Sequence, residues 1–231
     1  MTVTEKRSRL PKMEGSMARW YARQRGSANQ LEMYREQAGQ LTGQLPDGAA
    51  VLEVAPGPGY LAIEISRLGR FRVTGLDISR TFVDIATQHA RRENVSVDFR
   101  HGDVERMPLE SGTFDLIVCQ AAFKNFGQPV VALNEMHRVL RPGGLAVIQD
   151  MSRNASASDI ANDVRRMGAG RISGFVVRRT LAGLRLRAAS REQFEELAAA
   201  SAFGSCTVRT DGITMEVRLT KPAEGGEQAA S

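Results

Sequence analysis

The chain has 231 residues, of which 42% are hydrophobic and 25% charged, which is enough for one globular domain with a buried core. No run approaches the roughly 18 consecutive apolar residues that a membrane span needs, and the first residues lack the apolar segment of a secretory signal. Cys119 and Cys206 have no further Cys or His at metal-ligand spacing, which predicts two buried thiols and no metal site. We therefore expect a soluble, cytoplasmic enzyme.

The net charge of +5 and the isoelectric point near 9.7 raise the question of a nucleic-acid partner. The basic residues are nearly all arginine and are scattered through predicted helices, so background composition accounts for most of them. The exception is Met151–Arg191, where nine arginines stand among apolar residues against two acids. We expect no nucleic-acid partner, and we interpret residues 151–190 as an insert that resembles a lid.

The N-terminal segment predicts a helical cap. Residues 1–12 are polar and basic, and residues 223–231 are small and charged, so disorder is expected at both ends. Between residues 13 and 45 apolar positions recur at helical spacing, with breaks predicted near Gly26 and Gly39.

Beyond the cap, short apolar runs alternate with helical patterns. The runs lie at residues 51–55, 71–76, 95–100, 114–119 and 145–149, and the helical patterns lie mostly between them, at 60–68, 81–92 and 130–140. Parallel neighbouring strands need a crossover connection, which is usually a helix. This alternation therefore predicts a parallel sheet with helices on both faces.

The C-terminal part has a different pattern. Ser190 and Gln193 form a capping box before a helix at 192–200, and the runs 206–209 and 213–219 flank a turn. The predicted fold is a doubly wound α/β fold in which a seven-stranded, mostly parallel sheet ends in an antiparallel hairpin. Residues 46–222 form one Rossmann-like domain in this interpretation.

A glycine turn follows the first strand. Gly57 and Gly59 precede a helix, so backbone amides and the positive helix end would face a ligand. The turn also fits a dinucleotide pattern, with Asp77 about 20 residues further on to hold a ribose, so two cofactor classes stay open. Glu53 favours one of them, because a carboxylate in a buried strand is costly unless it is paired. A ligand ammonium would pair with it, and a nicotinamide cofactor offers none.

Several blocks between Val51 and Asp150 occur together in a fixed order. They are E-V-A-P-G-P-G from Glu53, G-L-D ending at Asp77, H-G-D-V-E-R-M-P-L from His101, F-D-L-I-V from Phe114 and R-V-L-R-P-G-G from Arg138. In this order they resemble the class I S-adenosylmethionine-dependent methyltransferases, specifically the group acting on small molecules and on quinone or lipid-like acceptors. The ordered set is more specific than the glycine turn alone.

The resemblance implies S-adenosyl-L-methionine as the cofactor. The implied contacts are Glu53, Ala55, Gly57, Gly59, Asp77, Ile78, Asp103, Val104 and Gln120. Among them, Glu53 would meet the methionine ammonium, Asp77 the ribose and Asp103 the adenine amino group. Ile78 and Val104 would pack against the adenine, and Gln120 would lie near the sulfonium.

Two places depart from the family pattern. Ala55 stands where relatives have the first glycine of the turn, and an alanine is tolerable there if its φ is negative. Lys124 and Asn125 stand where many relatives have adjacent histidines.

The acceptor side is less defined. Methyl transfer is a displacement at an activated carbon, so positioning supplies much of the rate and a base is optional. Asn125, Lys124 and His101 are candidate catalytic residues by residue type alone. The expected acceptor contacts are Trp20, Tyr21, Tyr34, Lys124, Asn125 and Asp150. The insert is expected either to close over an anionic or amphipathic acceptor or to be a solvated helical face.

The expected function is S-adenosylmethionine-dependent methylation of a small-molecule acceptor. The alternatives are an NAD(P)-dependent oxidoreductase, an RNA methyltransferase and a non-catalytic S-adenosylmethionine-binding module. The first of these leaves the Arg141–Gly144 block and the terminal hairpin unexplained. Monomer and homodimer stay equally open.

Overall fold

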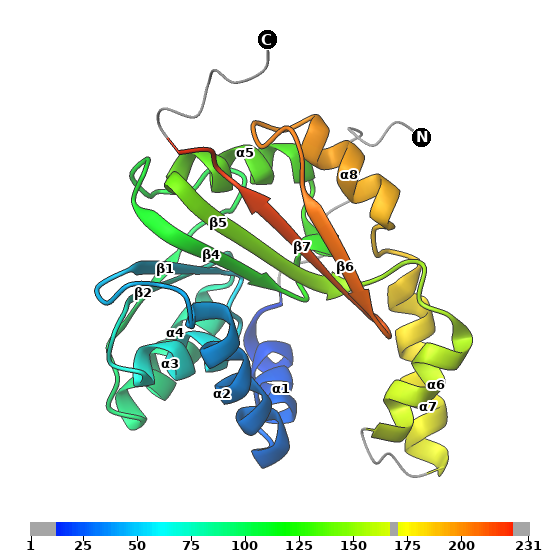
Figure 1. The fold of residues 1–231 in the computed structure, drawn as a ribbon. Helices are drawn as coiled ribbons and strands as arrows, with labels where there is room; N and C mark the ends of the chain where they lie inside the picture. Colours follow the sequence, from blue (N-terminus) through cyan, green and yellow to red (C-terminus); the bar gives the residue numbers. More distant parts are fainter. Residues whose placement is uncertain (1–12, 167–170, 224–231) are drawn as a thin grey trace.

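The computed structural model describes residues 13–166 and 171–223, so the predictions for residues 1–12 and 224–231 lie outside the described residues. One sheet has helices on both faces (Figure 1). Its strands are β1 (Ala50–Val54), β2 (Arg72–Asp77), β3 (Val97–His101), β4 (Phe114–Gln120), β5 (Leu140–Met151), β6 (Thr207–Asp211) and β7 (Thr214–Thr220). The helices are α1 (Gly15–Arg25), α2 (Ala28–Thr42), α3 (Tyr60–Arg67), α4 (Arg80–Arg92), α5 (Pro129–Val139), α6 (Ala157–Arg166), α7 (Arg171–Arg185), α8 (Arg191–Ala199) and the 3₁₀ helix η1 (Phe123–Asn125).

The strand order is β3-β2-β1-β4-β5-β7-β6. β1 to β5 are mutually parallel, whereas β7 is antiparallel to both β5 and β6. This confirms the predicted fold class, including the closing hairpin. The strand order reverses between β1 and β4, and in open α/β sheets ligands bind beyond the carboxyl ends of the strands at such a point.

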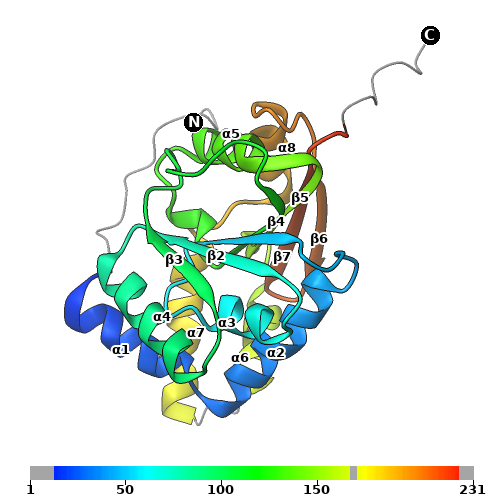
Figure 2. The same ribbon diagram turned by 90° about the vertical axis from the view of Figure 1, so that its left-hand side faces the viewer.

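The sheet lies between helices on its two faces (Figure 2). An apolar cluster packs against each face. On one face, Ile117 and Ile148 pack with residues of α5 and α8, and on the other Val51 and Val118 pack with α2 and α3. The alternating strand residues thus point to opposite cores, as expected for a sheet buried on both faces.

The N-terminal cap consists of α1 and α2. The predicted break at Gly26 is confirmed, since α1 ends at Arg25, but the predicted break at Gly39 is wrong because α2 continues through it. Gly39 is exposed, and a Cβ added there would meet nothing within 4 Å. A glycine inside a helix costs only about 1 kcal/mol, which the apolar contacts of Tyr34 and Ala38 offset.

β5 starts earlier than expected, at Leu140 instead of residue 145, because the Arg141–Gly144 block is part of the strand. The pairing register with β4 shifts between Phe114 and Leu116, which accommodates the extra residues. A Cβ at Gly144 would stand 2.9 Å from the carbonyl oxygen of Arg141. The glycine at this position is therefore required by the backbone.

The last segments follow the prediction closely. Ser190 and Gln193 form the capping box of α8, and β6 and β7 form the hairpin. Cys119 is buried, but Cys206 is only half-buried because β6 lies at the sheet edge. The insert forms a helical hairpin, α6–α7. In the described part of the chain, no helix is both long and apolar enough to cross a membrane.

Candidate functional site

The glycine turn lies at the carboxyl end of β1, beside the point where the strand order reverses. The φ angles of Ala55, Gly57 and Gly59 are 55°, 55° and 81°. The negative φ that would make an alanine readily tolerable at position 55 is therefore not observed. The Ala55 amide donates to the carbonyl oxygen of Leu76 on β2, which continues the pairing of β1 with β2 into the turn. An alanine in the left-handed region is strained.

The two glycines have different surroundings. A Cβ at Gly59 would lie 2.6 Å from the Phe99 ring and 2.8 Å from the Cβ of Ala86, so this glycine allows α3 and β3 to pack. A Cβ at Gly57 would meet nothing within 4 Å. The space above Gly57 is open to a ligand.

Glu53 is a buried carboxylate without a cationic partner. It is 4% exposed, and its Oε2 accepts a hydrogen bond from the amide of Ala62 at 2.8 Å. Burial is the main reason that the pKa of Glu53 is raised to about 8; the Ala62 amide lowers this pKa and the neighbouring Asp77 contributes to raising it. Within residues 13–166 and 171–223 it forms no ion pair. The site therefore gains stability when a ligand cation is present.

Asp77 ends β2 on the other side of the turn. Its two carboxylate oxygens accept from the amides of Gly57 at 3.0 Å and Ser79 at 2.8 Å. Burial raises the pKa of Asp77, while these two amides lower it. Each oxygen keeps a further lone pair for a ligand hydroxyl.

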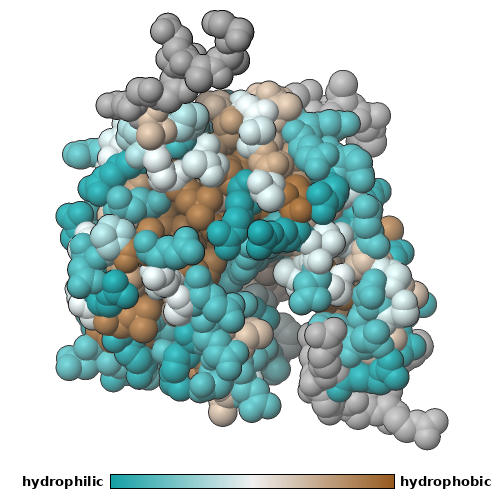
Figure 3. Space-filling model, in the orientation of Figure 1, coloured by the Kyte–Doolittle hydropathy of each residue, from teal (hydrophilic) through white to brown (hydrophobic). Residues whose placement is uncertain are grey.

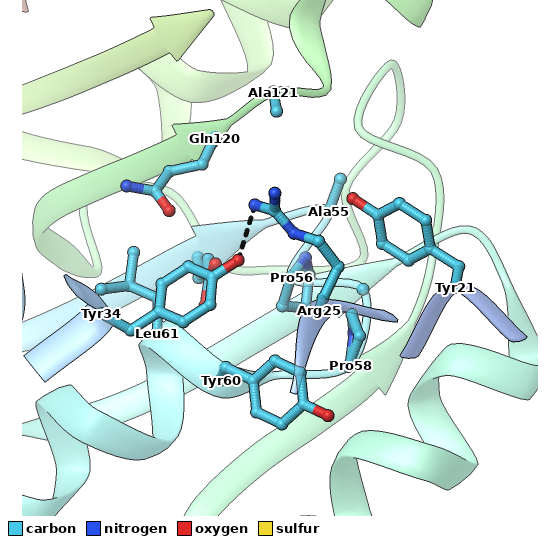
Figure 4. A pocket seen from close by; sticks show the side chains of 12 residues that line it. Tyr21, Arg25, Tyr34, Ala55, Pro56, Pro58, Tyr60, Leu61, Gln120 and Ala121 are labelled. Atoms are coloured by element: carbon cyan, nitrogen blue, oxygen red, sulfur yellow. Dashed lines mark hydrogen bonds between the residues drawn. The ribbon is translucent and has the colours of Figure 1, made fainter. Parts of the chain in front are cut away.

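Helices α1 and α2 close the pocket above the turn (Figure 4). Arg25 points into it and donates to the Tyr34 hydroxyl at 2.7 Å, and Tyr21 lies beside it. The Tyr60 hydroxyl donates to the carbonyl oxygen of Ala22 at 3.0 Å and connects α3 to α1. Sequence reasoning found Tyr21 and Tyr34 but missed Arg25 and Tyr60. The predicted helix break at Gly26 is the sequence signal that could have pointed to Arg25, the last residue of α1.

The N-terminal end of α1 is attached to the start of α4. The Glu14 carboxylate accepts from the amides of Arg80 at 3.1 Å and Thr81 at 3.0 Å, as a helix cap would. Ser79 also donates its hydroxyl to the carbonyl oxygen of Met13 at 2.8 Å. The cap is thereby held next to the residues that follow Asp77.

The residues expected at an adenine lie on the far side of Asp77. Asp103 lines a second hollow with Gly102 and Pro108, and its Oδ1 accepts from the amide of Glu105 at 3.0 Å. Ile78 is half-buried and Val104 is buried in the core. Gln120, at the end of β4, lines the first pocket.

The expected acceptor contacts are not all brought together. Trp20 is 56% exposed on α1 and does not line the pocket. Lys124 and Asp150 form a buried ion pair, with Nζ 2.8 Å from Oδ1, and lie outside the pocket lining. Asn125 and His101 are exposed. Among these, only Tyr21 and Tyr34 join the cofactor residues around the glycine turn.

The comparisons with known proteins agree with this arrangement. Residues 52–148 match a family model described as a methyltransferase domain. A demethylmenaquinone methyltransferase of Deinococcus radiodurans is 37% identical over 46% of this chain and 44% of its own length. A ubiquinone biosynthesis O-methyltransferase of Xanthomonas oryzae is 32% identical over 49% of this chain and 48% of its own length. The chain thus spans less than half the length of these curated relatives.

The fold is shared with solved structures. One from Methanococcus maripaludis, assigned as an S-adenosyl-L-methionine-dependent methyltransferase, superposes with a TM-score of 0.71 at 18% identity over 95% of this chain and 99% of that one. The motif order, the strand order and the matched region agree with one another. Residues 52–148 of this chain match the methyltransferase domain family, and the chain shares the fold of S-adenosylmethionine-dependent methyltransferases.

Proposed function

We propose that this protein transfers a methyl group from S-adenosyl-L-methionine to a small-molecule acceptor. The observation that carries the proposal is the pair of buried carboxylates, Glu53 and Asp77, on either side of a glycine turn at the sheet reversal. An amino-acid ammonium and a ribose on one ligand would satisfy both.

The residues fit this cofactor from end to end. Glu53 would hold the ammonium, and Asp77 would hold the ribose hydroxyls with the lone pairs its amide bonds leave free. Gly57 leaves open space for the part of the ligand that joins the ammonium group to the ribose. The Arg25 guanidinium is the cation that would receive the methionine carboxylate, since it reaches into the same pocket from α1.

The cofactor supplies a methyl group already activated by its sulfonium charge. The residues of this chain then act mainly by positioning, which in ideal intramolecular geometries is equivalent to about 10⁵ to 10⁸ M. Lys124 and Asp150 form an ion pair with each other, so neither side chain is free to act as a base toward the acceptor. A phenolate-like acceptor would need none.

The acceptor is proposed to be of the quinone type, as the names of the curated relatives suggest. A hollow separates the α6–α7 hairpin from the α1–α2 side of the molecule (Figure 3), and an acceptor would enter there. Arg178 and Arg179 are exposed on α7 and would attract an anionic or amphipathic molecule. Reversing both charges should weaken acceptor binding and leave cofactor binding unchanged. Unchanged acceptor affinity would show that the α6–α7 hairpin does not contribute to acceptor binding.

The test uses cofactor labelled in its methyl group. The chain is incubated with a panel of demethylated quinone precursors, RNA and a cell extract, and labelled products are separated into organic and aqueous phases. A labelled small molecule is the expected result. Label in RNA would favour the RNA methyltransferase, and cofactor binding without any labelled product would favour the non-catalytic module.

A further inference from the structure

A row of polar side chains crosses three neighbouring strands on the face that α2 covers. Gln120 on β4 pairs in register with Gln149 on β5, and Gln149 pairs with Glu216 on β7. The Gln120 Nε2 donates to the Gln149 Oε1 at 2.6 Å, and the Gln149 Nε2 donates to the Glu216 Oε2 at 2.8 Å. The row begins at a carboxylate and ends at the pocket.

Glu216 fixes the direction of these hydrogen bonds. Its Oε1 lies 2.8 Å from the Arg218 guanidinium, so an ion pair keeps the carboxylate charged. Burial raises the pKa of Glu216, but hydrogen bonds from Arg218 and Gln149 outweigh it and hold the pKa below its usual value. An ionised carboxylate can only accept hydrogen bonds.

The constraint passes from strand to strand. Because Glu216 only accepts, Gln149 must turn its amino group toward it and its carbonyl oxygen toward Gln120. Gln120 must then turn its own amino group toward Gln149, and the same nitrogen also donates to the Gln37 Oε1 on α2 at 3.2 Å. Both donors of Gln120 are used. In the described part of the chain, its Oε1 accepts no hydrogen bond and remains available to a ligand.

We propose that Glu216, acting through Gln149, is a positioning residue that makes Gln120 present a hydrogen-bond acceptor to the pocket. The ligand group that meets Gln120 must then be a donor. If the proposed function holds, that donor is the methionine ammonium, which would lie between Gln120 and Glu53. Residues on three strands would thereby select an amino-bearing cofactor over one in which a carbonyl or carboxylate occupies this place.

The matched perturbation is Glu216→Gln, because a glutamine has the same shape but can donate as well as accept. Gln149 and Gln120 are then free to turn over. The control is Glu195→Gln, which removes a charge from an exposed ion pair on α8 and leaves the row intact. Thermal melting identifies any variant that has lost its fold, and Glu216→Asp, which keeps the charge, should partly restore the native behaviour.

Two measurements test the proposal. The first compares the affinities of S-adenosylhomocysteine and its deaminated analogue by calorimetry. Glu216→Gln should reduce the preference for the amino form by about threefold to tenfold, whereas Glu195→Gln should not change it. This loss should disappear in a Gln120→Leu background, because the residue that transmits it is missing. An unchanged preference in folded Glu216→Gln protein would overturn the proposal.

The second measurement needs no ligand. The side-chain amide resonances of Gln149 and Gln120 are assigned in ¹⁵N-labelled protein with the help of leucine variants. Glu216→Gln should shift both sets of resonances, although Gln120 does not touch Glu216, and a shift confined to Gln149 would contradict the relay. Complete absence of S-adenosylhomocysteine binding by the native protein would instead reject the proposed function, while the amide resonances would still decide whether the relay exists.

Discussion

The buried carboxylate beneath the glycine turn leads to the sharpest prediction. Glu53→Gln keeps the shape of the side chain and an oxygen to accept from the Ala62 amide, but it removes the charge. We expect two opposite effects, because this charge is a cost in the empty protein and a gain in the complex. The empty variant should be more stable at alkaline pH, and the loaded variant should bind cofactor more weakly.

The stability effect has a definite sign. Burial raises the pKa of Glu53 from 4.5 to about 8, so the folded protein binds more protons than the unfolded chain between these values. The stabilisation is fully present below about pH 4.5 and is lost as the pH rises through about 8. Glu53→Gln has no such titration, so its thermal stability relative to the native protein should increase between pH 6 and pH 8.5.

The binding effect follows from the same charge. Removing one partner of a buried, hydrogen-bonded ion pair costs about 2 to 5 kcal/mol, which corresponds to a loss of roughly 30-fold or more in affinity. Native affinity for S-adenosylhomocysteine should rise from pH 6 to pH 8, because more empty sites then hold an ionised Glu53. The variant should lack this dependence.

Calorimetric titration at four pH values, with thermal melting at each, measures both effects on the same samples. Asp115→Asn is a suitable control, because Asp115 lies near the start of β4, whereas the glycine turn lies at the carboxyl edge of the sheet. The Asp115 carboxylate accepts hydrogen bonds from Arg141 and from the Ala50 amide. Equal affinities of native and Glu53→Gln protein, or a pH dependence that survives the substitution, would refute the assigned role of Glu53.

Three further predictions concern the glycine turn and the Lys124–Asp150 ion pair. Gly57→Ala should weaken S-adenosylhomocysteine binding at least tenfold and cost about 1 kcal/mol of stability, because its φ is positive although its Cβ would meet open space. Gly59→Ala should destabilise the fold by about 2 kcal/mol or more, because its Cβ would also strike the Phe99 ring. Equal losses of stability in the two variants would contradict this division. Ala55→Gly should stabilise the protein to denaturant by up to about 1 kcal/mol by relieving a positive φ, and a loss of stability would show that the turn is unstrained. Lys124→Met should cost about 3 to 5 kcal/mol in urea unfolding, and Lys124→Met combined with Asp150→Asn should recover part of it. If the single variant is fully stable but fails to bind acceptor, Lys124 is a binding residue instead of a structural one.

The sequence was sufficient to predict the sheet and to place Glu53 and Asp77 beside the glycine turn at one edge of it. Strand periodicity, the capping box at Ser190 and the terminal hairpin are local patterns, and the structure confirms them. Glu53 and Asp77 could be found from the sequence because Glu53 lies within a buried strand and Asp77 ends one. The two strands are parallel, so their carboxyl ends lie at the same edge of the sheet.

The remaining features depend on contacts between distant segments. Ala55 adopts its positive φ in a turn whose amide bonds to β2, and Lys124 pairs with Asp150 because β4 and β5 are adjacent. Arg25 reaches the pocket only because α1 folds back across the turn, and Trp20, five residues earlier, faces outward for the same reason. Periodicity identifies a helix, but it does not specify which face of that helix meets a site formed elsewhere.

The central claim is that the site formed by Glu53, Asp77 and the glycine turn between them binds S-adenosylmethionine. Its most direct test is a calorimetric titration of the native protein with S-adenosylhomocysteine and, separately, with NAD and NADP at pH 8. We predict one site per chain for S-adenosylhomocysteine, an affinity in the micromolar range that falls in Glu53→Gln, and no heat with either dinucleotide. Binding of a dinucleotide with no binding of S-adenosylhomocysteine would contradict the claim.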